Sequence, residues 1–145
     1  MSPPATPSAV PIPLELRHEI EDAYVRYWRV TADAALTLDP SQLPEVAAGD
    51  RLEREREEIA QLLAEGRARK VIVDLQFRVV RATETTATVY DDFKNLSYAV
   101  DRNTKAPLVE PPRAAEIHVV SFEMQKIDGV WKVVDGTRYE IQRPT

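Results

Sequence analysis

The sequence predicts an α+β domain in which N-terminal helices pack on one face of a bent antiparallel sheet of about four strands. Apolar residues recur at helical spacing in the first part of the chain, and from Lys70 onward they alternate with polar residues at a period of two. Asp128-Gly129 stands between two runs in which apolar and polar residues alternate. This pattern is the strongest short-range sequence signal of a β-hairpin. Helices followed by a run of strands are typical of the α+β class.

Composition limits the class of protein. The chain has 145 residues, of which 43% are hydrophobic and 30% charged, so it suits one domain of ordinary size. Its formal net charge of −5 argues against a nucleic-acid-binding face. Because the chain has no cysteine, it has no disulfide, thiolate metal site or cysteine nucleophile. No apolar stretch approaches the length of about 18–20 residues that a membrane span requires.

The chain divides into an N-terminal segment, residues 1–13, and a single domain over residues 14–142. Five of the eleven prolines lie in the first thirteen residues, which predicts an extended linker or a disordered arm. Two interpretations stay open: a frayed terminus, or the stalk of a larger protein from which a signal peptide, lipid anchor or membrane helix has been removed. The second interpretation favours an extracytoplasmic location over a cytoplasmic one.

Two helices are expected first. Leu14–Leu38 carries an apolar stripe at three- and four-residue spacing, with Pro13 in the first turn and a break at Asp39-Pro40. A second helix begins at Gly49-Asp50 and ends at Glu65. Asp50 and Glu53 have the spacing of a capping box, and Gly66 is placed to end the helix. We interpret the charged run over residues 51–58 as a solvated face.

The strands follow. Residues 71–79 alternate as a half-buried strand, and Arg81–Thr85 turns the chain. Thr86–Val100 forms a longer strand in which the apolar phase switches, which indicates a β-bulge or bend near Lys94-Asn95. Asp101–Arg113, with three prolines and few apolar residues, is expected to be a long exposed loop.

The closing hairpin has a register that can be derived. A two-residue turn at Asp128-Gly129 places Met124 opposite Val133, Lys126 opposite Trp131 and Phe122 opposite Asp135. Because side chains alternate between faces, one face is apolar and the other largely polar and wet. The long first helix is expected to cover the apolar face, which consists of His118, Val120, Phe122, Met124, Trp131 and Val133.

These features together resemble the NTF2-like superfamily, the cystatin-like cone fold of the nuclear transport factor 2, SnoaL-type cyclase and ketosteroid isomerase families. The resemblance rests on the first helix with its paired aromatics (Tyr24, Tyr27, Trp28), on the helix pair before a bent sheet, and on the D-G-x-W-K-V hairpin over residues 128–133. The chain looks most like non-catalytic bacterial branches of the superfamily that are carried on a Pro-rich stalk outside the membrane.

The resemblance implies a cavity between the long helix and the concave face of the sheet. Asp91 is the most informative candidate, because a carboxyl in an apolar cavity has a raised pKa and can act as a general acid or base. An isomerase-like site would pair it with a tyrosine donor, Tyr24 or Tyr27. The alternatives are that Asp91 faces solvent and that the tyrosines fill the core. The candidates to line the cavity are Tyr24, Tyr27, Trp28, Asp91, Phe93, His118, Phe122, Trp131 and Asp135.

No residue is assigned a catalytic role, and no metal or cofactor is expected. The two histidines, His18 and His118, are far apart in sequence and have no metal-binding spacing. No glycine-rich phosphate loop or nucleophile elbow is present.

Two functions are left for comparison. The first is a non-catalytic NTF2-like module, the soluble part of an envelope-attached protein, that binds an unknown protein partner or a small apolar ligand. The alternative is a small-molecule isomerase, cyclase or hydratase that uses Asp91 with tyrosine donors. A homodimer through the outer face of the sheet is an open expectation.

Overall fold

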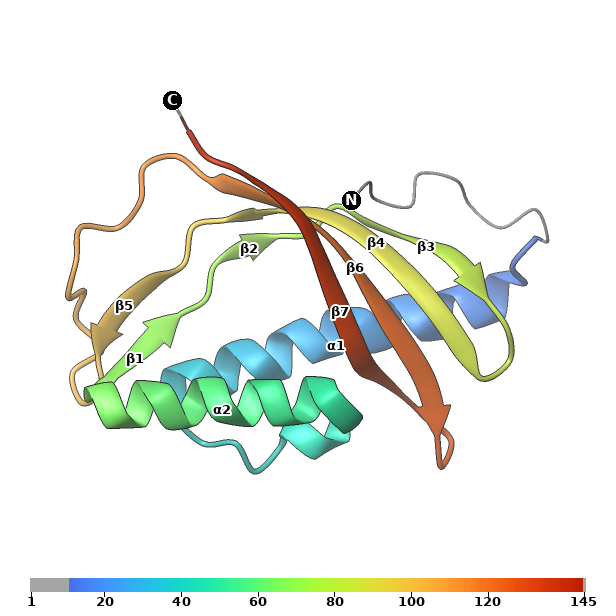
Figure 1. The fold of residues 1–145 in the computed structure, drawn as a ribbon, viewed down its shortest axis with the longest axis horizontal. Helices are drawn as coiled ribbons and strands as arrows, with labels where there is room; N and C mark the ends of the chain where they lie inside the picture. Colours follow the sequence, from blue (N-terminus) through green and yellow to red (C-terminus); the bar gives the residue numbers. More distant parts are fainter. Residues whose placement is uncertain (1–10, 145) are drawn as a thin grey trace.

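Two helices lie along one side of a curved antiparallel sheet in residues 11–144, the part of the chain that the computed structural model describes (Figure 1). This arrangement confirms the predicted α+β class. The predicted linker or arm lies mostly outside the described residues, but Ile12 is half-buried and packs against the core. The elements are α1 (Leu14–Thr37), a 3-10 turn η1 (Leu43–Glu45), α2 (Gly49–Glu65), β1 (Arg67–Lys70), β2 (Val73–Asp74), β3 (Phe77–Ala82), β4 (Thr86–Asn95), β5 (Tyr98–Asp101), β6 (Glu116–Ile127) and β7 (Val130–Gln142).

Both helices begin at the predicted residue and end within one residue of the predicted end, but the capping of their N-termini differs from the prediction. Pro13 is the N-cap of α1 and not part of its first turn; its carbonyl accepts the Arg17 amide at 2.9 Å. The N-cap of α2 is Ala48, which offers no capping side chain, so the capping box predicted for Asp50 is wrong. Asp50 instead lies in the first turn, where its negative charge suits the helix dipole. Gly66 ends α2 in the left-handed conformation, with φ 72°.

The strands form two sheets. A five-stranded sheet has the order β2-β4-β6-β7, with β3 also paired to β4, and a small second sheet pairs β1 with β5. The single strand predicted over residues 71–79 is wrong, because this stretch is interrupted between β2 and β3, two separate strands of the main sheet that both pair with β4. Leu96-Ser97 separates β4 from β5, close to the predicted bend at Lys94-Asn95. The chain leaves one sheet there and enters the other.

The hairpin register is confirmed near the turn and shifts farther away. Met124 pairs with Val133 and Lys126 with Trp131, and both turn residues have the positive φ of a type I′ turn (Asp128 51°, Gly129 80°). A bulge in β7 then shifts the pairing, so Phe122 lies opposite Gly136 and not Asp135. A Cβ at Gly136 would lie only 3.0 Å from two atoms of the Phe122 ring. Glycine therefore allows this ring to approach β7 closely.

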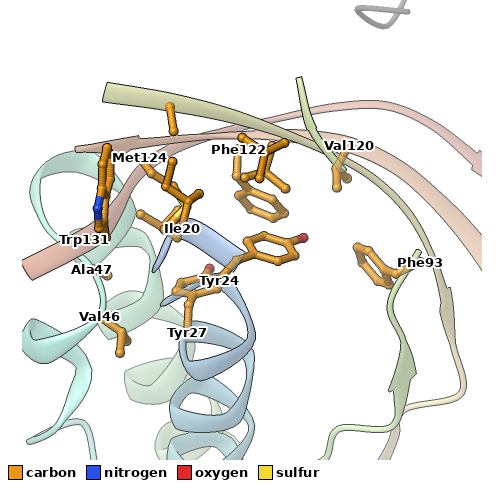
Figure 2. Packing of buried hydrophobic residues seen from close by; sticks show 14 residues of the cluster. Ile20, Tyr24, Tyr27, Val46, Ala47, Phe93, Val120, Phe122, Met124 and Trp131 are labelled. Atoms are coloured by element: carbon orange, nitrogen blue, oxygen red, sulfur yellow. The ribbon is translucent and has the colours of Figure 1, made fainter. Parts of the chain in front are cut away.

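The core lies between α1 and the inner face of the sheet (Figure 2). Tyr24 and Tyr27 of α1 contact Phe122 with ring centroids 5.7 and 5.8 Å apart. On the opposite face of the sheet, Val119 and Ser121 are also buried, so the prediction that this face is largely wet is wrong in its centre. Among residues 11–144, no helix is both long enough and apolar enough to cross a membrane.

Candidate functional site: a pocket between the helices and the sheet

A cavity of about 510 Å³ opens between α1, α2 and the β1–β5 pair, and reaches the inner face of the main sheet. Its volume falls within the range of about 300–1,000 Å³ that is typical of small-molecule pockets. Apolar side chains supply much of the wall, namely Trp28, Ala35, Ile59, Leu62, Val71, Val73, Phe93 and Val109. A cavity with such a wall can hold an apolar molecule.

Aromatic side chains are stacked along the sheet side of the pocket. Trp28 meets Phe93 edge-on with centroids 4.7 Å apart, and Phe93 stacks on the His118 ring at 4.9 Å. His118 Nε2 lies 3.1 Å from Glu116 Oε1 and 3.3 Å from Asn95 Nδ2. Within residues 11–144, no hydrogen-bond partner reaches the buried His118 Nδ1. The histidine is thus held as part of the aromatic wall.

A hydrogen-bonded triad of Tyr27, Arg51 and Glu55 borders the pocket between the two helices. The Tyr27 hydroxyl donates to Glu55 Oε1 at 2.7 Å and accepts from Arg51 Nε at 2.7 Å. Arg51 Nη2 lies 2.8 Å from Glu55 Oε1. Burial raises the pKa of Tyr27 well above its usual value, so the phenol is neutral and can donate. Since Glu55 is buried and Arg51 half-buried, the solvated face predicted for residues 51–58 is wrong at these two positions.

Asp91 lies in the core, where it accepts two hydrogen bonds. The Tyr24 hydroxyl donates to Oδ2 at 2.6 Å, and the Gln76 amide donates to Oδ1 at 2.9 Å. Burial raises the pKa of Asp91 to about 6, although both hydrogen bonds oppose the shift. Asp91 does not border the pocket, and both of its oxygens have protein partners. The carboxyl is thus separated from the space that a ligand would occupy.

The structure separates the predicted cavity residues into three groups. Tyr27, Trp28, Phe93 and His118 line the pocket. Tyr24, Asp91, Phe122 and Trp131 are buried in the core instead, and the Trp131 indole donates to Glu19 Oε1 at 2.9 Å. The prediction for Asp135 is wrong: the β7 bulge turns this residue to the outer face, where it is exposed.

Sequence reasoning missed Arg51, Glu55 and Arg138 among the pocket residues. Arg51 and Glu55 had a detectable signal, because they share a helical stripe with Ile59 and Leu62 at four- and three-residue spacing. Arg138 had none, since an unbroken hairpin register would turn it to the outer face. The bulge in β7 places it opposite Val120, whose side chain is buried in the core.

No group of three or more histidine or carboxylate side chains within residues 11–144 is arranged to hold a metal ion. The polar and charged side chains of the pocket wall can form hydrogen bonds and ion pairs, and its apolar side chains can pack against a ligand.

Comparisons with known proteins support the fold. No protein-family model and no curated protein sequence matches the chain. Its structure is similar to the intermembrane space region of the chloroplast protein ARC6, with a TM-score of 0.67 and 17% identity over 84% of this chain and 95% of that one. It is also similar to an uncharacterised protein with a cystatin-like fold from Caulobacter vibrioides, with a TM-score of 0.54 and 14% identity over 87% and 92% of the two chains. The chain therefore has a cystatin-like cone fold.

Proposed function

We propose that the chain is a non-catalytic binding module of the NTF2-like type, and that a small, largely apolar ligand occupies the pocket between its helices and sheet. The observation that carries this proposal is the 510 Å³ cavity itself, with its wall of aliphatic and aromatic side chains. Because Trp28, Phe93 and His118 are already in contact with one another, a flat apolar ligand would find a preformed wall.

The alternative, an isomerase, cyclase or hydratase that uses Asp91, has less support. The raised pKa of Asp91 and its short bond to the Tyr24 hydroxyl are features of catalytic carboxyls. A general acid or base, however, has to come within hydrogen-bond reach of its substrate. The carboxyl lies outside the pocket wall and is held by Tyr24 and Gln76, so these bonds are better explained as structural.

Filling the pocket should abolish binding of an apolar probe. Ala99 of β5 is half-buried and lines the cavity, so the Ala99→Trp variant places an indole in the space of the ligand. We expect the parent to bind the neutral dye N-phenyl-1-naphthylamine with enhanced fluorescence. The variant should bind it at least about tenfold more weakly, because its pocket no longer has room for the dye.

Ala60→Trp provides the matched control, because Ala60 is exposed on α2 outside the pocket. This variant adds the same side chain and should bind the dye like the parent. Equal melting temperatures for the three proteins would show that the fold is intact. The proposal is overturned if the parent does not bind the dye, or if Ala99→Trp binds it as well as Ala60→Trp does.

The composition of residues 1–13 supports a further part of this proposal, an extracytoplasmic location in a bacterial envelope, with this domain carried on a stalk. Protease treatment of intact spheroplasts from the source cells tests the location, since digestion is expected only for a protein outside the cytoplasmic membrane. A homodimer through the outer face of the sheet stays a prediction that light scattering at several concentrations would test.

A further inference from the structure

The charged residues of the pocket differ in sign from those of the chain as a whole. The chain carries a formal net charge of −5. The pocket, in contrast, is lined by four arginines and two glutamates: Arg51, Arg67, Arg69, Arg138, Glu55 and Glu58. Positive charge is therefore concentrated at the pocket of an otherwise acidic protein, and such a local field attracts anions.

Three of these arginines already have a carboxylate partner. Arg51 pairs with Glu55 at 2.8 Å, one turn away on α2, and Arg69 of β1 pairs with Glu58 of α2 at 3.1 Å. All four residues line the pocket. The third, Arg67, pairs with Glu65 at 2.7 Å. These guanidinium groups are thus at least partly neutralised by the protein.

Arg138 differs from the other three. Its side chain is exposed and borders the pocket. Within residues 11–144, this side chain makes no ion pair and no hydrogen bond. Its position follows from the β7 bulge, which pairs it with Val120 and so turns it to the inner face of the sheet. A guanidinium with five free donors at the edge of an apolar cavity is suited to a carboxylate or sulfonate.

We propose that the ligand of this pocket is a small amphipathic anion, whose apolar body lies against Trp28 and Phe93 and whose carboxylate or sulfonate binds Arg138. This inference rests on the proposed function and specifies the chemical class of its ligand. The two halves of the ligand match the two parts of the site: the aromatic wall formed by α1 and β4, and the unpaired guanidinium of Arg138 on β7. The volume of about 510 Å³ suits a molecule of two to three rings or a medium-length aliphatic acid.

Two dyes that share most of their apolar body test the inference. The first, 8-anilinonaphthalene-1-sulfonate, carries a sulfonate, whereas N-phenyl-1-naphthylamine has the same rings without it. Fluorescence titration of the full chain should show tighter binding of the sulfonate. Arg138→Gln should weaken the sulfonate about tenfold and leave the neutral dye within about twofold, because only the charge-assisted bond is lost.

Arg81→Gln is the matched control, because Arg81 is exposed on β3 and lies outside the pocket wall. It removes one positive charge and should change neither affinity. The inference is overturned, with the proposed function intact, if both dyes bind the parent and bind Ala99→Trp more weakly, while Arg138→Gln changes the affinity for neither dye. Both are overturned if neither dye binds, or if Ala99→Trp leaves both affinities unchanged.

Discussion

At pH 7, the Asp91→Asn variant is expected to be about 2 kcal/mol more stable than the parent, since a folded-state pKa two units above the usual value disfavours the charged form by about 3 kcal/mol. The carboxyl is fully buried, and burial raises its pKa from 3.8 to about 6. Asparagine stays neutral and can preserve both contacts: its oxygen accepts from Gln76, and its amide donates to the Tyr24 hydroxyl oxygen, which can serve as acceptor.

The same substitution should remove a dependence of stability on pH. The folded-state pKa of Asp91 is raised, so the folded state holds the proton more tightly than the unfolded state does. Its contribution to stability is therefore fully present below about pH 4 and is lost as the pH rises through about 6. Near pH 4 the parent and the variant should be similar in stability, and by pH 7 they should differ.

Urea unfolding of both proteins between pH 4 and pH 7 measures this difference. Asp92→Asn is the matched control, because Asp92 is the next residue on β4, is only half-buried and pairs with Val119 on the outer face of the sheet. It should shift stability little and evenly across this range. A variant at Asp91 that is less stable than the parent at pH 7, with an unchanged pH dependence, contradicts the placement of the carboxyl in the core.

Removing the cation from the Tyr27–Arg51–Glu55 triad is the second large effect. We expect Arg51→Met to lower the free energy of unfolding by about 3 kcal/mol, because Glu55 would stay buried without a counter-charge. The side chains of Arg51 and Glu55 are only 19% and 9% exposed, so water cannot replace the lost partner easily. The variant also loses the guanidinium that lies 5.2 Å from the Phe122 ring centroid.

A second ion pair on the same helix supplies the control. Arg56 and Glu53 lie 3.1 Å apart at a three-residue spacing, but their side chains are 46% and 66% exposed. Arg56→Met should therefore change stability by less than about 0.5 kcal/mol. Arg51→Met combined with Glu55→Leu should be less destabilising than Arg51→Met alone, because no buried charge is left unpaired. Equal losses for Arg51→Met and Arg56→Met would contradict the buried triad.

The sequence predicted those features that local residue patterns determine. The helical spacing of α1 and α2 and the Asp128-Gly129 turn led to the α+β class and to the pairing of Met124 with Val133. The turn is predictable because both of its residues adopt positive φ, which restricts the residue types there.

The remaining features depend on contacts between distant segments. No local pattern marks the bulge in β7, which moves Asp135 out of the inner face and brings Arg138 in. The division of residues 67–82 among β1, β2 and β3 depends on which strand each segment meets, β5 or β4. Alternation predicts an extended chain, but it does not specify the partner strand.

The two tryptophans of the chain allow a direct test of the pocket as the binding site. The Trp28 ring lines the cavity, whereas Trp131 is buried elsewhere and bonds to Glu19. A proton–nitrogen correlation spectrum of the labelled protein thus contains one indole signal from the pocket and one internal control. On titration with 1-naphthol as a neutral apolar probe, we expect the Trp28 signal to shift and saturate while the Trp131 signal stays in place. Movement of the Trp131 signal alone, or of neither signal at saturating probe, would contradict the assignment of this pocket as the ligand site.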